Sequence, residues 1–193
     1  MAALFEEMGS KGVERNTMTY NATISACEKG GQLQRAVELF EEMGRQGVDW
    51  DTITYNATIS ACEKGGQFDR CVTLYGDACL LGFLYHSLPS HKGGIDLHGL
   101  CTSVAKAAIV LLLSRSDSGT GRLGGHLAFV AGRGNHVLAD GRRGVLRAEM
   151  ELFLTEQLGL PVQTVHVNDG MLIVRAVNVA PFLQAGRPGD STR

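Results

Sequence analysis

The chain has 193 residues, of which 44% are apolar and 20% are charged, and its formal net charge is −2. These proportions are typical of a folded protein and argue against a disordered chain. The longest apolar run, Ala107 to Leu113, is too short to span a bilayer, so we expect no membrane partner.

The charge is unevenly distributed along the chain. Residues 1–86 hold 7 Lys and Arg against 12 Asp and Glu, whereas residues 87–193 hold 11 against 8. The first fourteen residues carry three glutamates and no basic cluster, so they resemble neither a secretory signal nor a transit peptide. Five cysteines without a CxxC pair favour a reducing setting and give no zinc-site spacing.

The first half of the chain contains an internal repeat. The stretch TYNATISACEKGGQ occurs at residues 19–32 and again, unchanged, at residues 54–67, a period of 35 residues. A fixed period in this range is typical of a solenoid of stacked units.

Each unit is predicted to be a helical hairpin. The first helix buries one face at intervals of three and four residues, and Gly30–Gly31 then reverses the chain. A second helix follows, and Gly47 occupies its C-terminal cap. The expected buried residues are Tyr20, Ile24 and Cys27 on the first helix and Leu33, Ala36, Val37, Phe40 and Met43 on the second.

The period and wording of TYNATISACEKGGQLQRAVELFEEMGRQGVDWD resemble the pentatricopeptide repeat (PPR), a 35-residue helical hairpin of organellar RNA-binding proteins. The tetratricopeptide repeat, which binds proteins, is the alternative, but its period is 34 residues. In the register of the PPR family, residues 1–86 divide into a partial unit at 1–16, a full unit at 17–51 and a degenerate unit at 52–86.

The resemblance implies that each unit contacts one base of single-stranded RNA. It assigns base reading in the full unit to Asn21 and Asp51, with Met18 packing against the base, and this pair implies a preference for uracil. The next unit offers Asn56 and Ile53, but its final position is His86, outside the usual code. A structural role for the asparagine, as a cap or a hydrogen-bonding group along its own helix, is the alternative.

Residues 87–94 read as a linker, residues 95–183 as a second domain and residues 184–193 as a disordered tail. The pattern predicts the order βαβαββ, so the fold class is α-helical hairpin repeats (an α-solenoid) followed by a small α/β domain in two layers. The predicted strands are 95–99, 127–131, 163–167 and 171–177, with helices from about Thr102 and Val145 and a loop at 114–125.

Two candidate sites lie in this second segment. Asp96 and His98 should share one face of a strand, since side chains alternate, and a carboxylate beside an imidazole suits proton transfer or metal binding. The loop AGRGNH at 131–136 can bind an anion through backbone N–H groups and an arginine. A hydrogen-bonded pair and an ordinary turn are the structural alternatives.

Together these motifs resemble the Smr (small MutS-related) domain over about residues 92–180, so the chain resembles the PPR-SMR family. IDLH at 95–98 matches an LDxH motif, and AGRG at 131–134 matches TGxG with Ala131 in place of Thr. The resemblance implies an endonuclease that uses Asp96 and His98 on RNA, or that nicks DNA. It assigns nucleic-acid contact to Gly132, Arg133, Gly134 and His136.

The leading hypothesis is therefore an organellar RNA-processing protein, plastid more readily than mitochondrial by resemblance, whose Smr domain cleaves RNA. A divalent metal, Mg or Mn, is possible, but there is no carboxylate cluster like those of two-metal nucleases. The alternatives are an RNA-binding or RNA-protecting factor without catalysis and a protein-interaction scaffold. Ala131 lacks the side-chain hydroxyl that Thr supplies in the TGxG motif, and this absence favours the non-catalytic alternative.

Overall fold

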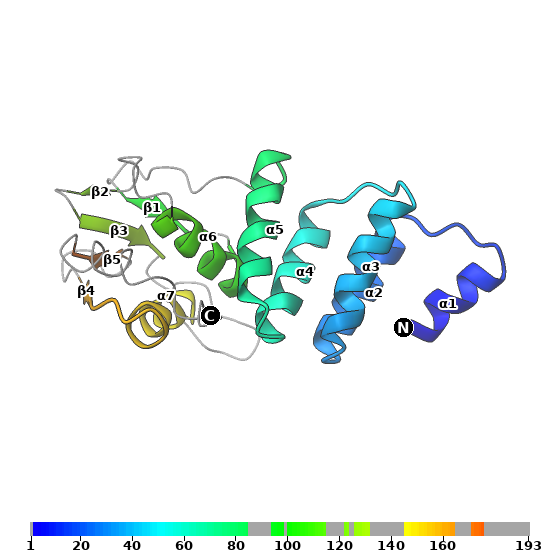
Figure 1. The fold of residues 1–193 in the computed structure, drawn as a ribbon, viewed down its shortest axis with the longest axis horizontal. Coiled ribbons are helices and arrows are strands. Elements are labelled where there is room, and N and C mark those ends of the chain that lie inside the picture. The colour runs from blue at the N-terminus through cyan, green and yellow to red at the C-terminus, as the bar shows by residue number, and fades with distance from the viewer. Residues whose placement is uncertain are drawn as a thin grey trace, which may run out of the picture. The chain divides into compact units, whose positions relative to one another are not determined.

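A computed structural model describes residues 2–84, 94–98, 100–114, 122–123, 126–131, 145–164 and 171–175. The chain divides into two compact units, Met1–Tyr85 and His86–Arg193 (Figure 1). Seven α-helices and five strands are present in the described residues. None of these helices combines the length and apolarity needed to cross a membrane.

The first unit is a row of helices, and each hairpin packs on the next (Figure 1). The predicted helical repeats are confirmed: α2 pairs with α3 in one hairpin, and α4 pairs with α5 in the next. Gly31 and Gly66 reverse the chain inside the hairpins with φ of 73° and 71°, a conformation that glycine adopts without strain. The helices are α1 (Ala2–Ser10), α2 (Thr17–Lys29), α3 (Leu33–Arg45), α4 (Thr52–Lys64) and α5 (Phe68–Leu80).

The core of this unit follows the predicted apolar stripes. Every residue expected to be buried on α2 and α3 is buried except Leu33, which is half-buried at the start of α3. Cys27 and Cys62 are buried at equivalent places, as expected of one small apolar position used twice. Helix α5 belongs to the degenerate unit, in which Cys71, Gly76 and Cys79 depart from the repeat pattern. It nevertheless has the same length as α3, and both cysteines are buried.

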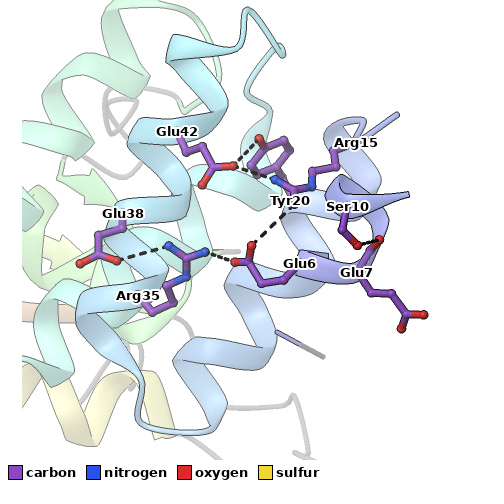
Figure 2. A network of polar contacts seen from close by, with 8 residues as sticks. All are labelled: Glu6, Glu7, Ser10, Arg15, Tyr20, Arg35, Glu38 and Glu42. Atoms are coloured by element: carbon purple, nitrogen blue, oxygen red, sulfur yellow. Dashed lines mark hydrogen bonds and ion pairs between the residues drawn. The ribbon is translucent and has the colours of Figure 1, made fainter. Parts of the chain in front are cut away.

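A polar network joins α1, α2 and α3 (Figure 2). The guanidinium of Arg15 donates to Glu42 at 3.0 Å and lies 4.1 Å from the centroid of the Phe5 ring. The hydroxyl of Tyr20 donates to the same Glu42 oxygen at 3.2 Å. Burial and the neighbouring Glu42 carboxylate raise the pKa of Tyr20. Arg15 of the partial unit and Tyr20 of the full unit thus share the Glu42 carboxylate as acceptor, and this contact links the two units.

A repeated ion pair spans consecutive second helices of the hairpins. Arg35 on α3 pairs with Glu6 on α1, and Arg70 on α5 pairs with Glu41 on α3. The two arginines are 35 positions apart in sequence, and so are the two glutamates, so the ion pairs recur with the period of the repeat.

The second unit contains a small mixed sheet with strand order β1-β3-β5-β4, and β2 pairs with β3. Strand β1 is parallel to β3, whereas β5 is antiparallel to both β3 and β4. Its elements are β1 (Ile95–Asp96), α6 (Thr102–Ser114), β2 (Arg122–Leu123), β3 (His126–Val130), α7 (Val145–Leu152), a π-helical turn (Phe153–Gln157), β4 (Val162–Thr164) and β5 (Met171–Val174).

The described elements include one strand that the pattern did not predict. Strand β2 lies in the segment expected to be a loop, because two residues there bond to β3. On α6, Ile109 and Leu113 are buried, whereas Leu111 and Leu112, which were expected on its buried side, are half-buried. The domain therefore has a small sheet with helices, and its predicted βαβαββ two-layer arrangement stays a prediction.

The centre of the sheet is apolar on both of its faces. Phe129 and Leu172 are cross-strand partners on one face, and both are fully buried. On the other face Ala128 and Val130 pack with Met171. Strand β1, which begins the LDxH-like motif, pairs along its two residues with Phe129 and Val130 of β3.

Candidate nucleic-acid interface

The candidate interface lies where α2 and α4 begin, and capping residues shape both helix ends. Asp51 is the N-cap of α4: its carboxylate accepts from the backbone N–H of Thr54 at 2.8 Å. The backbone N–H of Asp51 donates in return to the Thr54 hydroxyl at 3.1 Å, which completes a capping box. Asn16 caps α2 through Thr19 in the equivalent place.

The structure brings Asn21 and Asp51, the two residues that the resemblance assigns to base reading, into direct contact. The Asn21 amide nitrogen donates to both carboxylate oxygens of Asp51, each at 3.0 Å. These two residues are thirty positions apart in sequence and belong to neighbouring helices of the array. The amide and the carboxylate therefore form one polar group at the boundary between units.

Asn21 is more deeply buried than a base-reading residue needs to be, with an exposed fraction of 7%. The structural alternative for this asparagine is a role as a cap or as a hydrogen-bonding group along its own helix. Its side chain bonds instead to Thr54 on α4 and to Asp51, the N-cap of that helix. Only a small edge of the amide remains for a ligand.

Thr54 is the residue that sequence reasoning missed. It is fully buried, and its hydroxyl lies 2.6 Å from Asn21 Oδ1 and 2.9 Å from Asp51 Oδ1. The spacing Asp-x-x-Thr at the start of a helix is a capping-box signal and could have identified its bond to Asp51. Its bond to Asn21 has no such local signal, since the partner is 33 residues away.

The electrostatics of Asp51 follow from these contacts. Burial acts to raise the pKa of the carboxyl, but hydrogen bonds from the Thr54 backbone, the Thr54 hydroxyl and the Asn21 amide outweigh it. The pKa of Asp51 therefore lies below its usual value, and the group is a carboxylate at neutral pH.

Exposed apolar side chains lie close to this polar group. Met18 precedes Asn21 by one turn of α2 and is 78% exposed, and Ile53 precedes Thr54 and is 58% exposed. They are equivalent positions of consecutive units, so an apolar side chain stands beside the start of each first helix. Asn56, the predicted reader of the following unit, is half-buried on α4. His86 lies outside the described residues.

In the second unit the structure brings Asp96 and His98 together. Ile95 and Leu97 are fully buried, as the alternation of a strand predicts, while Asp96 and His98 face outward. Asp96 Oδ1 accepts from the backbone N–H of His98 at 2.9 Å and also contacts imidazole Nδ1. The carboxylate thus fixes the orientation of the ring.

The other predicted contacts in this unit lie outside the described residues: Gly132, Arg133, Gly134 and His136. Ala131, which replaces the Thr of the TGxG motif, is described and buried after β3. Residues 87–93 of the predicted linker at 87–94, and the whole predicted tail at 184–193, also lie outside the described residues.

The described side chains were tested for a metal site. Asp96 and His98 supply two donors that already contact each other. No group of three or more His, Cys, Asp or Glu side chains that could hold a metal occurs among the described residues. This donor set does not fit a Mg or Mn site, which prefers several oxygen ligands.

Comparison with known families identifies the repeats. Residues 15–64 match the PPR repeat family, and residues 53–83 match the PPR repeat. Both matches lie in the first unit and together cover α2 to α5. A search of curated proteins gave no match. The family matches support a PPR protein, and PPR repeats indicate RNA binding.

Proposed function

We propose that the chain binds single-stranded RNA through the boundary between its repeats and prefers uracil there. The observation that carries the proposal is the Asn21–Asp51 contact at 3.0 Å, with Met18 and Ile53 exposed beside it. Apolar side chains can pack on any base face, whereas the amide edge can discriminate between bases.

The proposed preference for uracil follows from the hydrogen-bonding groups that remain. The Asn21 amide turns its nitrogen toward Asp51, and its oxygen keeps one free lone pair beyond the Thr54 contact. Uracil offers an N3–H donor that complements this acceptor, whereas the amide nitrogen is engaged with both Asp51 oxygens. Cytosine carries no proton at N3 and presents an acceptor there.

An array of this length binds weakly. Stacking contributes roughly 1–3 kcal/mol per base, and the described repeats offer about two base positions. The acidic balance of residues 1–86, 7 cations against 12 anions, adds no general attraction for phosphate. We therefore expect micromolar or weaker affinity, and DNA is a possible second ligand.

We further propose that residues 95–183 form an Smr domain that cleaves RNA, with His98 as the general acid or base. Asp96 contacts Nδ1, so in the neutral ring the proton lies there and Nε2 is free to accept one. Asp96 then acts by orienting the imidazole. This contact favours an orienting role for the Asp96 carboxylate over a role as the base itself or as a metal ligand.

A non-catalytic RNA-binding or RNA-protecting factor is the second candidate. The buried Ala131 supports it, because the hydroxyl of the TGxG motif is missing beside the sheet. By resemblance either function belongs to RNA processing in an organelle, plastid more readily than mitochondrion.

The experiment is incubation of the full chain with end-labelled, uracil-rich single-stranded RNA, beside Asp96→Asn and His98→Ala, with and without EDTA. Cleavage by the wild type that both substitutions abolish supports the nuclease, and the EDTA lanes report metal dependence. Bound but intact RNA in every lane supports the second candidate. Absence of any mobility shift with RNA contradicts both.

A further inference from the structure

We propose that Thr54 is a positioning residue that sets the orientation of the Asn21 amide and thereby the preference for uracil over cytosine. This inference rests on the proposed function, because it concerns how the same polar group reads a base. Thr54 belongs to the unit that follows the base-reading asparagine, so the specificity of one unit depends on its neighbour.

The geometry of the hydroxyl carries the argument. Thr54 Oγ1 lies 2.6 Å from Asn21 Oδ1 and 2.9 Å from Asp51 Oδ1, so its single proton serves these two acceptors. The Asn21 nitrogen faces the Asp51 carboxylate at 3.0 Å. An amide turned by 180° would place its oxygen against that carboxylate and its nitrogen against the hydroxyl.

Two partners therefore hold the amide in one orientation. Asp51 attracts its nitrogen, and Thr54 donates to its oxygen. Without the hydroxyl, the amide oxygen would be buried with one partner fewer, and only Asp51 would oppose the flipped arrangement that matches cytosine. Since Thr54 is fully buried, water does not replace its hydroxyl readily.

The chain contains a matched position for comparison. Thr19 is the equivalent threonine at the start of α2, and its hydroxyl donates to the capping residue Asn16 at 2.9 Å. The hydrogen bonds that Thr19 donates within the described residues go to Asn16. Thr19 thus shares with Thr54 the two bonds to the side chain of the N-cap residue, without the contact to Asn21.

The experiment compares the full-length wild type with Thr54→Val, Thr54→Ser and Thr19→Val. Binding to octamers of uridine and of cytidine is measured by fluorescence anisotropy, and the ratio of the two dissociation constants is the readout. We expect Thr54→Val to reduce the uridine preference about fivefold, the effect of one net hydrogen bond. Thr54→Ser and Thr19→Val should keep the wild-type ratio.

A structural measurement accompanies the binding assay. In the RNA-free, 15N-labelled chain, the side-chain amide resonances of Asn21 should shift in Thr54→Val and stay in place in Thr19→Val. The helical circular dichroism of each variant separates a local change from unfolding. If Thr54→Val unfolds the repeats, Thr54→Ser must retain both the ratio and the amide resonances, and a change in either overturns the proposal.

The remaining outcomes are also decisive. If the wild type prefers uridine and folded Thr54→Val keeps the full preference, the inference about Thr54 is wrong while the proposed uracil reading stands. An equal loss in Thr19→Val assigns the effect to helix capping and overturns the inference. If the wild type shows no uridine preference, the proposed function fails at this site, and the inference fails with it.

Discussion

Arg15 and Trp50 occupy the same position in successive repeats, and each lies on a phenylalanine ten residues before it. The Arg15 guanidinium is 4.1 Å from the centroid of Phe5, and the Trp50 and Phe40 ring centroids are 5.3 Å apart in a stacked arrangement. The indole N–H of Trp50 also donates to the Phe40 carbonyl at 3.2 Å. Within each unit, one flat group thus lies on another at the end of the unit that meets the next one.

The first prediction concerns Arg15. Its side chain is mostly buried, pairs with Glu42 at 3.0 Å and lies over Phe5, so Arg15→Ala removes a cation–π contact and an ion pair together. We expect a loss of about 2 kcal/mol in the free energy of unfolding. Urea denaturation followed by circular dichroism measures it.

Arg35→Ala is the comparison for Arg15→Ala. Arg35 pairs with Glu6 and Glu38 nearer the surface, where ion pairs contribute less than about 1 kcal/mol and weaken in salt. Equal losses from the two substitutions would contradict the importance of the stacked contact.

The second prediction concerns Gly44 on α3. A Cβ at this position would overlap the indole ring of Trp50. Gly44→Ala should therefore destabilise the repeats by about 1–3 kcal/mol, the usual effect of overpacking, despite the better helix propensity of alanine. Trp50 is the single tryptophan of the chain, so its emission reports the displacement directly.

Gly76→Ala is the matched control. Gly76 also lies inside a helix, but among the described residues no atom beyond its chain neighbours and the backbone of its own helix lies within 4 Å of an added Cβ. Alanine there should stabilise the unit by roughly 0.5–1 kcal/mol and leave the tryptophan emission unchanged. Stabilisation by both substitutions would show that the indole moves aside without cost.

The third prediction concerns acid stability. The pKa values of Asp51 and Glu28 are both lowered: for Glu28, burial opposes the shift, but bonds from Lys64 and Ser60 outweigh it. A carboxyl with a lowered folded-state pKa stabilises the fold above its unfolded pKa, about 4, and loses this contribution as pH falls through the folded value. Stability should therefore decline from about pH 5 downward.

The pH profile of the double variant Asp51→Asn, Glu28→Gln tests this origin. Its free energy of unfolding should fall less steeply between about pH 5 and pH 2 than that of the wild type. Glu14→Gln, at an exposed position, serves as the control. A wild-type slope in the double variant would assign the acid sensitivity to other carboxyls.

The fourth prediction separates capping from base reading at Asp51. Asp51→Ala and Asn16→Ala each remove an N-cap, worth about 1 kcal/mol. Asp51→Ala also leaves the Asn21 amide and the Thr54 hydroxyl with a missing partner, which adds about 1–3 kcal/mol.

Binding to RNA distinguishes the two variants further. Asp51→Ala should lose the uridine preference, whereas Asn16→Ala should retain it. Thermal unfolding and anisotropy with uridine and cytidine octamers provide the two measurements. Loss of preference in both would show that helix capping, and not the Asn21 contact, determines the reading.

Much of the first unit could be predicted because its determinants are local. The apolar periodicity and the paired glycines predict the helices. Because residues 19–32 recur unchanged at 54–67, the same prediction applies to both copies. The alternation around Ile95 to His98 likewise predicts which side chains are buried. Short-range patterns suffice wherever a helix or strand has one buried face.

The rest depends on contacts between distant residues. The burial of Asn21 and its bond to Thr54 result from the stacking of α2 on α4, and no local pattern in α2 reveals them. Strand β2 forms because two residues pair with β3, although their segment reads as a loop. The TGxG-like loop, apart from Ala131, lies outside the described residues, so its predicted nucleic-acid contacts stay predictions.

At the position shared by Arg15 and Trp50, residues of different charge make the same kind of packing contact. A guanidinium and an indole differ in charge and polarity, yet both are planar and both fit between a phenylalanine and a glycine of the preceding helix. The common property of the two side chains at this position is a planar group. An array that grows by copying its units can therefore change the electrostatic character of a joint, and with it the attraction for a polyanion, while the register of its base-reading positions stays fixed.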